Sequence, residues 1–129
     1  MNILCVSATE FEIAPFLKAK PATDFLVSGV GAPAAIYHLA KRLQQIDYDL
    51  VIQAGVAGSF KSSLKLSEVV FVKQDCFADL GISEQHEFFT IFEKGFGSEN
   101  DFPFKKGCLK NSLKLIILIQ PISYLTYNL

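Results

Sequence analysis

The run Tyr48-Asp-Leu-Val-Ile-Gln-Ala-Gly55 is apolar at successive positions in its centre. Such a run predicts a strand that is covered on both faces, as strands of parallel sheets are in α/β proteins. Residues 2–7, 24–29 and 68–72 predict further strands, and residues 10–19 and 32–45 predict helices. The order strand, helix, strand, helix, strand indicates an α/β fold.

The carboxy-terminal third departs from this alternation. Residues 77–107 contain many Phe residues and little periodicity, which predicts a long irregular excursion that shapes a site or packs on a partner. Residues 109–129 are apolar and β-prone, and no Asp or Glu follows Asp101. We therefore expect a main domain over residues 1–108 and an apolar tail of uncertain origin over residues 109–129.

Composition excludes several classes of protein. The chain has 129 residues, of which 50% are hydrophobic, so it suits one domain with a real core. A formal net charge of -1 gives no electrostatic footprint for nucleic acid or an anionic membrane. No apolar run has the length of a membrane helix, and Cys5, Cys76 and Cys108 lack the spacing of a metal site or disulfide framework. We expect a cytoplasmic protein with reduced thiols, no metal and no cofactor.

The segment Ser28-Gly-Val-Gly-Ala-Pro-Ala-Ala35 has the G-x-G-x-x-A spacing of dinucleotide-binding turns. Asp49 lies twenty residues after Gly29, before the apolar centre of the strand predicted at 48–55. An acid that binds a ribose should instead lie at the carboxyl end of that strand. The alternative is that Gly29 and Gly31 permit a tight turn and close helix packing, and this structural interpretation is favoured.

The segment Gln53-Ala-Gly-Val-Ala-Gly-Ser-Phe60 places glycines where the central strand ends. Ligands of open α/β sheets bind at this carboxyl edge, so backbone amides here are candidates for ligand contacts. The alternative, a turn with a purely structural role, is equally favoured.

The segment Ser7-Ala-Thr-Glu-Phe-Glu-Ile-Ala-Pro-Phe16 contains Thr9-x-x-Glu12, which fits a helix capping box. Pro15 opposes a helix that begins at Glu10, because it would lie past the first turn. A kinked or later helix would leave Glu12 free to face the sheet edge, while Glu10 stays on the surface.

Four segments in this order resemble the amino-terminal half of the purine nucleoside phosphorylase and nucleosidase family: the strand with "SATEFEIAPF", "SGVGAPAAIYHLAKRL", "DLVIQAGVAGSF" and "LKLSEVVFV". The resemblance covers about residues 2–108 and is greatest to the hydrolase branch. The details "ATEFEIAP", "FADLG" and "GFGSENDFPF" are more similar to futalosine hydrolases, of menaquinone biosynthesis, than to methylthioadenosine/adenosylhomocysteine nucleosidases. The resemblance implies a three-layer α/β/α phosphorylase/hydrolase-like fold, which would be truncated in this chain.

The resemblance also assigns roles to residues of the amino-terminal segments. The family cleaves the N-glycosidic bond of purine-type nucleosides, and its hydrolases activate water with the last acid of an E-x-E pair, which matches Glu12. Thr9 matches a sugar contact. The turn after the central strand contacts nucleoside and water, which maps onto Val56, Ala57 and Gly58, although many hydrolases have a hydroxyl residue in place of Val56.

Other implied features concern the later part of the chain. Phe96 and Pro103 resemble a segment that reaches the neighbouring subunit's pocket in family homodimers, with a core aromatic and a rigid turn as alternatives. Lys105-Lys106 fits a solvated turn better than a phosphate site. The family's ribose-binding Met-Glu pair and its leaving-group Asp have no match after Asp101.

This absence predicts that the chain alone has little or no hydrolase activity. Three functions follow: an impaired futalosine-type hydrolase, a fragment of a methylthioadenosine/adenosylhomocysteine nucleosidase, or a noncatalytic ligand-binding or association module.

Overall fold

The computed structural model describes residues 1–19, 21–60, 62–111 and 115–121, and it divides into two compact units. The first unit holds Met1–Val72 together with the strand at 115–121, and the second lies within Lys73–Ser112. Each unit is described by itself. Residues 122–129, the end of the expected tail, lie outside the described residues.

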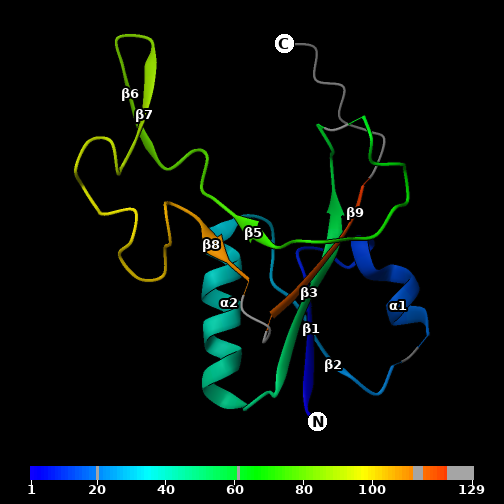
Figure 1. Ribbon diagram of the computed structural model, residues 1–129. Helices are drawn as coiled ribbons and strands as arrows, with labels where there is room; N and C mark the ends of the chain where they lie inside the picture. Colours follow the sequence, from blue (N-terminus) through cyan, green and yellow to red (C-terminus); the bar gives the residue numbers. More distant parts are fainter. Residues whose placement is uncertain (20, 61, 112–114, 122–129) are drawn as a thin grey trace. The chain divides into compact units, whose positions relative to one another are not determined.

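In its described residues the first unit contains two α-helices, one short 3₁₀ turn and five strands. Figure 1 labels α1, α2, β1, β2, β3 and β9 among them. In chain order they are β1 (Ile3–Ser7), η1 (Phe11–Ile13), α1 (Ala14–Lys18), β2 (Asp24–Val27), α2 (Ala32–Gln45), β3 (Leu50–Ala57), β4 (Val70–Phe71) and β9 (Leu115–Pro121). Neither these helices nor any other described part of the chain is long and apolar enough to cross a bilayer as a helix.

One sheet with the order β2-β1-β3-β9-β4 joins these strands. β2, β1, β3 and β9 run parallel, with Cys5 opposite both Phe25 and Ile52, and β4 pairs antiparallel with β9. A mixed α/β class with a largely parallel sheet is thereby confirmed, while the three-layer arrangement stays a prediction. Part of the expected tail, 115–121, pairs along the whole of β3 from Val51 onward.

The core of the first unit is concentrated on β1. Leu4, Cys5 and Val6 are buried there, and Ile13 of η1 is buried as well. Because burial disfavours the thiolate, the pKa of Cys5 is raised, which agrees with a structural role for this thiol. Among the side chains that the structure describes, Leu4 is the large apolar one with no exposed surface, so its truncation should be costly for this unit.

Helix α2 has the predicted bounds, 32–45, and its start explains the two preceding glycines. Gly29 and Gly31 have φ of 82° and 90°, and a Cβ on Gly29 would lie 3.2 Å from the Ala34 Cβ. Pro33 lies in the first turn, where its missing N–H costs nothing. Both glycines therefore serve the turn and the close packing of the helix, as the structural interpretation predicted.

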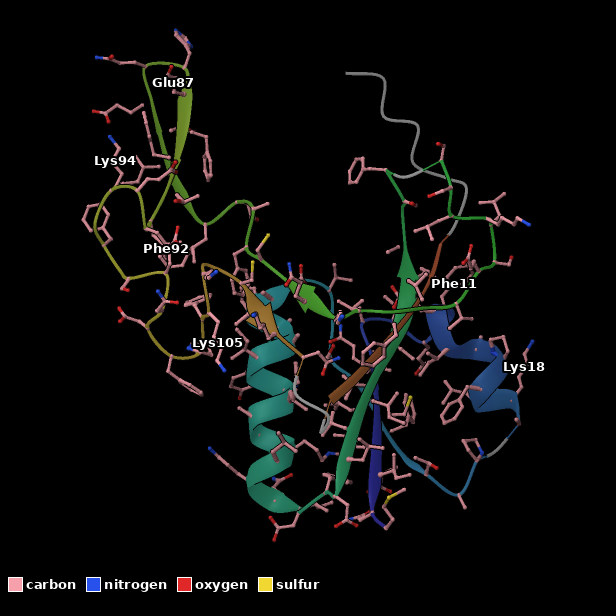
Figure 2. The ribbon with its side chains drawn as sticks, in the orientation of Figure 1. Phe11, Lys18, Glu87, Phe92, Lys94 and Lys105 are labelled. Carbon is pink, nitrogen blue, oxygen red and sulfur yellow. The ribbon has the colours of Figure 1, made fainter. Side chains whose placement is uncertain are left out.

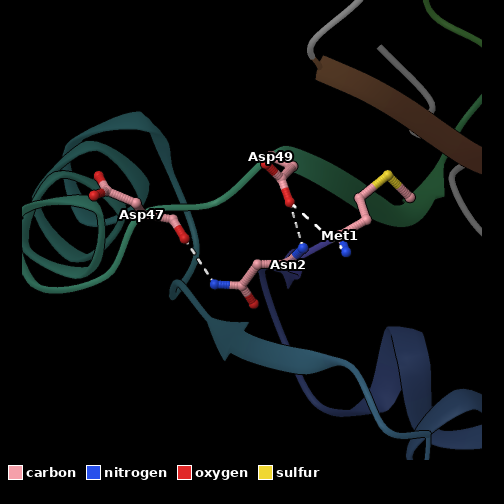
Figure 3. Close-up of polar contacts among 4 residues, drawn as sticks. All are labelled: Met1, Asn2, Asp47 and Asp49. Carbon is pink, nitrogen blue, oxygen red and sulfur yellow. Dashed lines mark hydrogen bonds and ion pairs between the residues drawn. The ribbon is translucent and has the colours of Figure 1, made fainter.

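Asp49 lies at the amino end of β3, away from the turn at Gly29. Its Oδ2 accepts a hydrogen bond of 2.6 Å from the Asn2 backbone N–H and lies 4.0 Å from the Met1 amino group (Figure 3). The Asn2 side-chain amide also donates to the Asp47 carbonyl oxygen over 2.7 Å. Asp49 therefore anchors the start of β1 to the start of β3, which agrees with the position argument against a dinucleotide site.

The second unit corrects the expectation of an irregular excursion over 77–107. β6 (Gly81–Glu84) and β7 (Glu87–Thr90) form an antiparallel hairpin, and β5 (Gln74–Asp75) pairs with β8 (Leu109–Lys110). The hairpin turn is Gln85-His86, with φ of 51° and 70°. Positive φ at both turn residues is typical of a type I′ turn, but the pair lacks the Asn-Gly signature that would have predicted it.

Candidate functional site

The carboxyl ends of three neighbouring strands meet at one edge of the parallel sheet. Ser7 ends β1, Ser28 follows β2, and Gly55 lies in β3, two residues before this strand ends at Ala57. The Ser28 backbone N–H donates to the Ser7 carbonyl oxygen over 2.8 Å, and the Ser28 hydroxyl donates to the same oxygen over 3.3 Å. Both serines are buried, so the strand ends that support the edge are tied together.

The chain crosses this edge in the segment that carries Thr9 and Glu12. The Thr9 hydroxyl oxygen accepts a hydrogen bond of 3.4 Å from the Glu12 backbone N–H, which is half of the predicted capping box. The α-helix itself begins at Ala14, with Pro15 in its first turn, so the proline does delay the helix. The side chain of Glu12 is therefore held on a short 3₁₀ turn, ahead of the helix.

The Glu12 carboxylate turns toward the sheet edge and does not close the capping box. Its Oε2 accepts a hydrogen bond of 3.0 Å from the Ser7 hydroxyl. A Cβ on Gly55 would lie only 2.8 Å from the same oxygen, so the carboxylate packs directly on the β3 backbone. Within the described residues Oε1 accepts no hydrogen bond, and Glu12 is half-buried, so this oxygen can accept one from a water or ligand.

The residues predicted to contact nucleoside directly follow Gly55, on which this carboxylate packs. Val56 and Ala57 belong to β3 and are half-buried, whereas the sequence had placed both in the turn after the strand. They extend β3 because they pair with Gln120 and Pro121 of β9. Gly58 follows the strand and is exposed. Thr9, Glu12 and the end of β3 are thus brought to the same sheet edge.

Phe96 and Pro103 belong to the second unit. Phe96 is exposed and follows Gly95, whose φ of 74° ends a helical turn in which the Phe96 N–H donates to the Ile91 carbonyl oxygen. Pro103 lies in a tight turn that the Phe104 N–H closes on the Asp101 carbonyl oxygen over 2.7 Å. Phe96 is thus not a core aromatic of this unit, and the turn alternative for Pro103 describes its local structure.

Two residues of the site were not singled out from the sequence. Ser7 directly precedes the Ala8-Thr9 segment, and a hydroxyl residue at the end of a buried strand is the signal that could have identified it. Gly55 was recognised as part of a glycine-containing strand end, but its close approach to Glu12 depends on the pairing of β1 with β3. The sequence alone does not indicate how close Gly55 lies to the Glu12 carboxylate.

The arrangement suits acid–base chemistry by one carboxylate. Glu12 has a fixed oxygen and a second oxygen open to a ligand, which are the properties of a group that accepts a proton from bound water. In the described ranges no three His, Cys, Asp or Glu side chains gather in a way that could hold a metal ion.

Comparison with known proteins bears on the family of this chain. A futalosine hydrolase from Streptomyces coelicolor is 32% identical to this chain over an alignment of 85 residues, and the match covers 62% of the chain. The match spans 36% of that relative's length. No protein-family model matches the sequence. The similarity supports a relationship to the nucleosidase family, at the coarse level that the sequence motifs predicted.

Proposed function

We propose that this chain carries the water-activating half of a nucleoside hydrolase site, with Glu12 as its catalytic base. The observation that carries the proposal is the Glu12 carboxylate at the carboxyl edge of the sheet, bound by Ser7 and packed on Gly55. The substrate class is a small-molecule purine-type nucleoside. Futalosine is the first candidate, because the similar Streptomyces protein is a futalosine hydrolase.

In the proposed reaction water attacks the anomeric carbon as the N-glycosidic bond breaks. The bonding electrons leave with the base nitrogen, and Glu12 accepts the proton of the attacking water. Thr9 contacts the sugar, and the backbone at Val56, Ala57 and Gly58 contacts nucleoside and water. Phe96 and Pro103 would contribute to the pocket of a partner subunit in a homodimer, which sedimentation analysis of the purified chain would test.

The leaving nitrogen must also gain a proton, and this step would limit the rate at which the 129-residue chain hydrolyses a purine nucleoside. No Asp or Glu follows Asp101, so the late general acid of the family has no counterpart within these residues. General acid catalysis contributes about 10²–10⁴-fold. We infer that the chain by itself hydrolyses purine nucleosides poorly or not at all.

A substrate whose leaving group needs no proton separates the two halves of this proposal. para-Nitrophenyl riboside releases a stable phenolate, so the chain should cleave it with dependence on Glu12 while futalosine and methylthioadenosine react far more slowly. Glu12→Gln should abolish the release of para-nitrophenol. Glu10→Gln is the matched control, because Glu10 is an exposed acid two residues away.

Equal cleavage by the Glu12→Gln and Glu10→Gln variants would overturn the role of Glu12. Base release from methylthioadenosine exceeding that from futalosine would favour the methylthioadenosine/adenosylhomocysteine nucleosidase alternative. Saturable binding of adenine or hypoxanthine in calorimetry, without cleavage of any substrate, would favour a noncatalytic binding module.

A further inference from the structure

The second unit contains a cavity of about 910 Å³ that the proposed hydrolase site does not use. Pockets for small ligands fall in the range of about 300–1,000 Å³. Its lining combines three lysines, two asparagines, two Phe rings and two other apolar residues: Lys105, Lys106, Lys110, Asn100, Asn111, Phe102, Phe104, Pro103 and Leu109. No acidic side chain lines it among the described residues.

The three lysine ammonium groups are available to a ligand. Within the described residues Lys105, Lys106 and Lys110 have no carboxylate within ion-pair distance. The same unit does neutralise another lysine, since Lys94 pairs with Glu84 and lies over the Phe89 ring. Three unpaired cations around one cavity repel one another, and a bound anion would relieve that repulsion.

The two acids of this loop do not serve as partners for these cations. Asp101 Oδ2 accepts a hydrogen bond of 2.9 Å from the Ser98 backbone N–H, which closes a local turn. Glu99 contributes its backbone carbonyl oxygen to the Gly107 N–H over 2.9 Å. Within the described residues neither carboxylate forms an ion pair with a lysine of the lining, so the lining keeps its positive charge.

The lysines lie on an ordered turn. The Lys105 N–H donates to the Cys108 carbonyl oxygen over 2.8 Å, and the intervening Lys106 and Gly107 have φ of 54° and 70°. These values are typical of a type I′ hairpin turn. The Lys106 N–H also donates to the Asn100 side-chain oxygen over 3.0 Å, so the turn is bound to the opposite wall. Binding an anion here would order lysine side chains on a backbone that is already fixed.

Aromatic rings provide a second kind of contact. Phe104 packs edge-to-face on Phe92, with ring centroids 5.2 Å apart, and is anchored in the unit by that contact. Figure 2 labels Phe92 and Lys105 of this unit. Phe102, by contrast, is 97% exposed although it lines the cavity. An exposed ring beside unpaired cations can stack on a planar group while the cations hold an anionic one.

We propose that this cavity binds a nucleoside monophosphate, with the phosphate held by Lys105, Lys106 and Lys110 and the base stacked on Phe102. The Asn100 side-chain amide keeps its N–H groups to donate to the base or sugar, because its oxygen is engaged by Lys106. The solvated turn predicted at Lys105-Lys106 agrees with the two exposed lysines of this turn, and the proposal adds an anion-binding role to it.

Isothermal titration calorimetry of the full chain with adenosine 5′-monophosphate tests the proposal, with adenosine and inorganic phosphate as comparison ligands. The monophosphate should bind saturably and more tightly than either, and its affinity should fall as salt rises. Lys105→Gln, Lys110→Gln and Phe102→Ala should each weaken it by about tenfold, the loss of one charge-assisted or stacking contact. Lys105→Arg should retain binding, and Lys41→Gln on exposed α2 is the matched control for net charge.

These outcomes separate this site from the proposed hydrolase site. Binding that is lost in Glu12→Gln but kept in Lys105→Gln would place the ligand at the sheet edge and overturn the proposal. If adenosine bound as tightly as its monophosphate, the role of the lysines would be overturned. If inorganic phosphate bound as tightly as the monophosphate, the role of Phe102 would be overturned. Absence of saturable binding would also overturn it, provided that circular dichroism shows a folded chain.

Discussion

The Ser7 hydroxyl, at the end of β1, donates a 3.0 Å hydrogen bond to Oε2 of Glu12, which lies five residues later in η1, the turn that precedes α1. This bond diverts the carboxylate from the Thr9 backbone amide that a complete capping box would use. The segment Thr90-x-x-Glu93 shows the complete form: Glu93 Oε2 accepts from the Thr90 N–H over 2.7 Å, and the Thr90 oxygen accepts from the Glu93 N–H over 3.2 Å. The same pattern thus gives a cap in one place and an open carboxylate in the other.

We expect Ser7→Ala to lower the free energy of unfolding by about 1–3 kcal/mol, because it removes a hydrogen bond to a charged group and leaves a small void. The double variant with Glu12→Gln should show coupling of about 1 kcal/mol between the two side chains. Urea denaturation measures both quantities. Ser83→Ala, on an exposed strand position, is the control and should change stability little. Additive effects of the two substitutions would contradict the contact.

Gly55→Ala should displace the Glu12 carboxylate, since the new Cβ would lie 2.8 Å from Oε2. The φ of Gly55 is not in the left-handed region, so the backbone accepts alanine and the loss of stability should stay below about 1 kcal/mol. The Ser7–Glu12 coupling and any Glu12-dependent cleavage of para-nitrophenyl riboside should both fall. The shorter acid in a Gly55→Ala/Glu12→Asp double variant should recover part of the coupling. A Gly55→Ala variant that loses stability while the Ser7–Glu12 coupling stays unchanged would count against this explanation.

Gly81→Ala should disrupt the β6–β7 hairpin. The added Cβ would lie 2.1 Å from the Phe89 carbonyl oxygen, and backbone atoms paired across a hairpin cannot move aside independently. Gly97→Ala is the matched control, because its nearest neighbour would be an ordinary contact at 3.9 Å. Hydrogen exchange of residues 81–90 should accelerate strongly in the first variant and stay unchanged in the second. Equal exchange rates would contradict the hairpin register.

Glu93 makes a contribution to the free energy of unfolding that depends on pH. Hydrogen bonds from the Thr90 backbone N–H and then from its hydroxyl hold the pKa of Glu93 below its ordinary value of about 4.3. A lowered folded-state pKa means that this contribution is present above the unfolded-state pKa and is lost as pH falls through the folded-state pKa. Thr90→Val should raise the pKa of Glu93 by removing the hydroxyl, as NMR titration of the Glu93 carboxyl carbon would detect. An unchanged midpoint would contradict the role of the hydroxyl.

Sequence patterns predicted elements where local signals and tertiary packing agree. Helix α2 occupies the predicted residues 32–45, because Gly31 and Pro33 mark its start as local chemistry requires. The strand predicted at 48–55 occurs at Leu50–Ala57 because its end is decided by pairing with β9, whose position no local signal specifies. The hairpin at 81–90 was missed because Gln85-His86 adopts positive φ without the usual turn residues.

The sequence by itself determined the α/β class, the placement of α2, the structural role of Gly29 and the candidacy of Glu12. Local periodicity and backbone preference are enough for the first three, since each depends on residues within a few positions of one another. The candidacy of Glu12 depends on Pro15 together with the resemblance to the nucleosidase family. Tertiary structure decided which partner the Glu12 carboxylate takes and that lysines and an exposed Phe ring share a cavity. Those outcomes depend on strand register and turn geometry, which bring Ser7 and Gly55 to one oxygen and Lys105 and Lys110 to one wall.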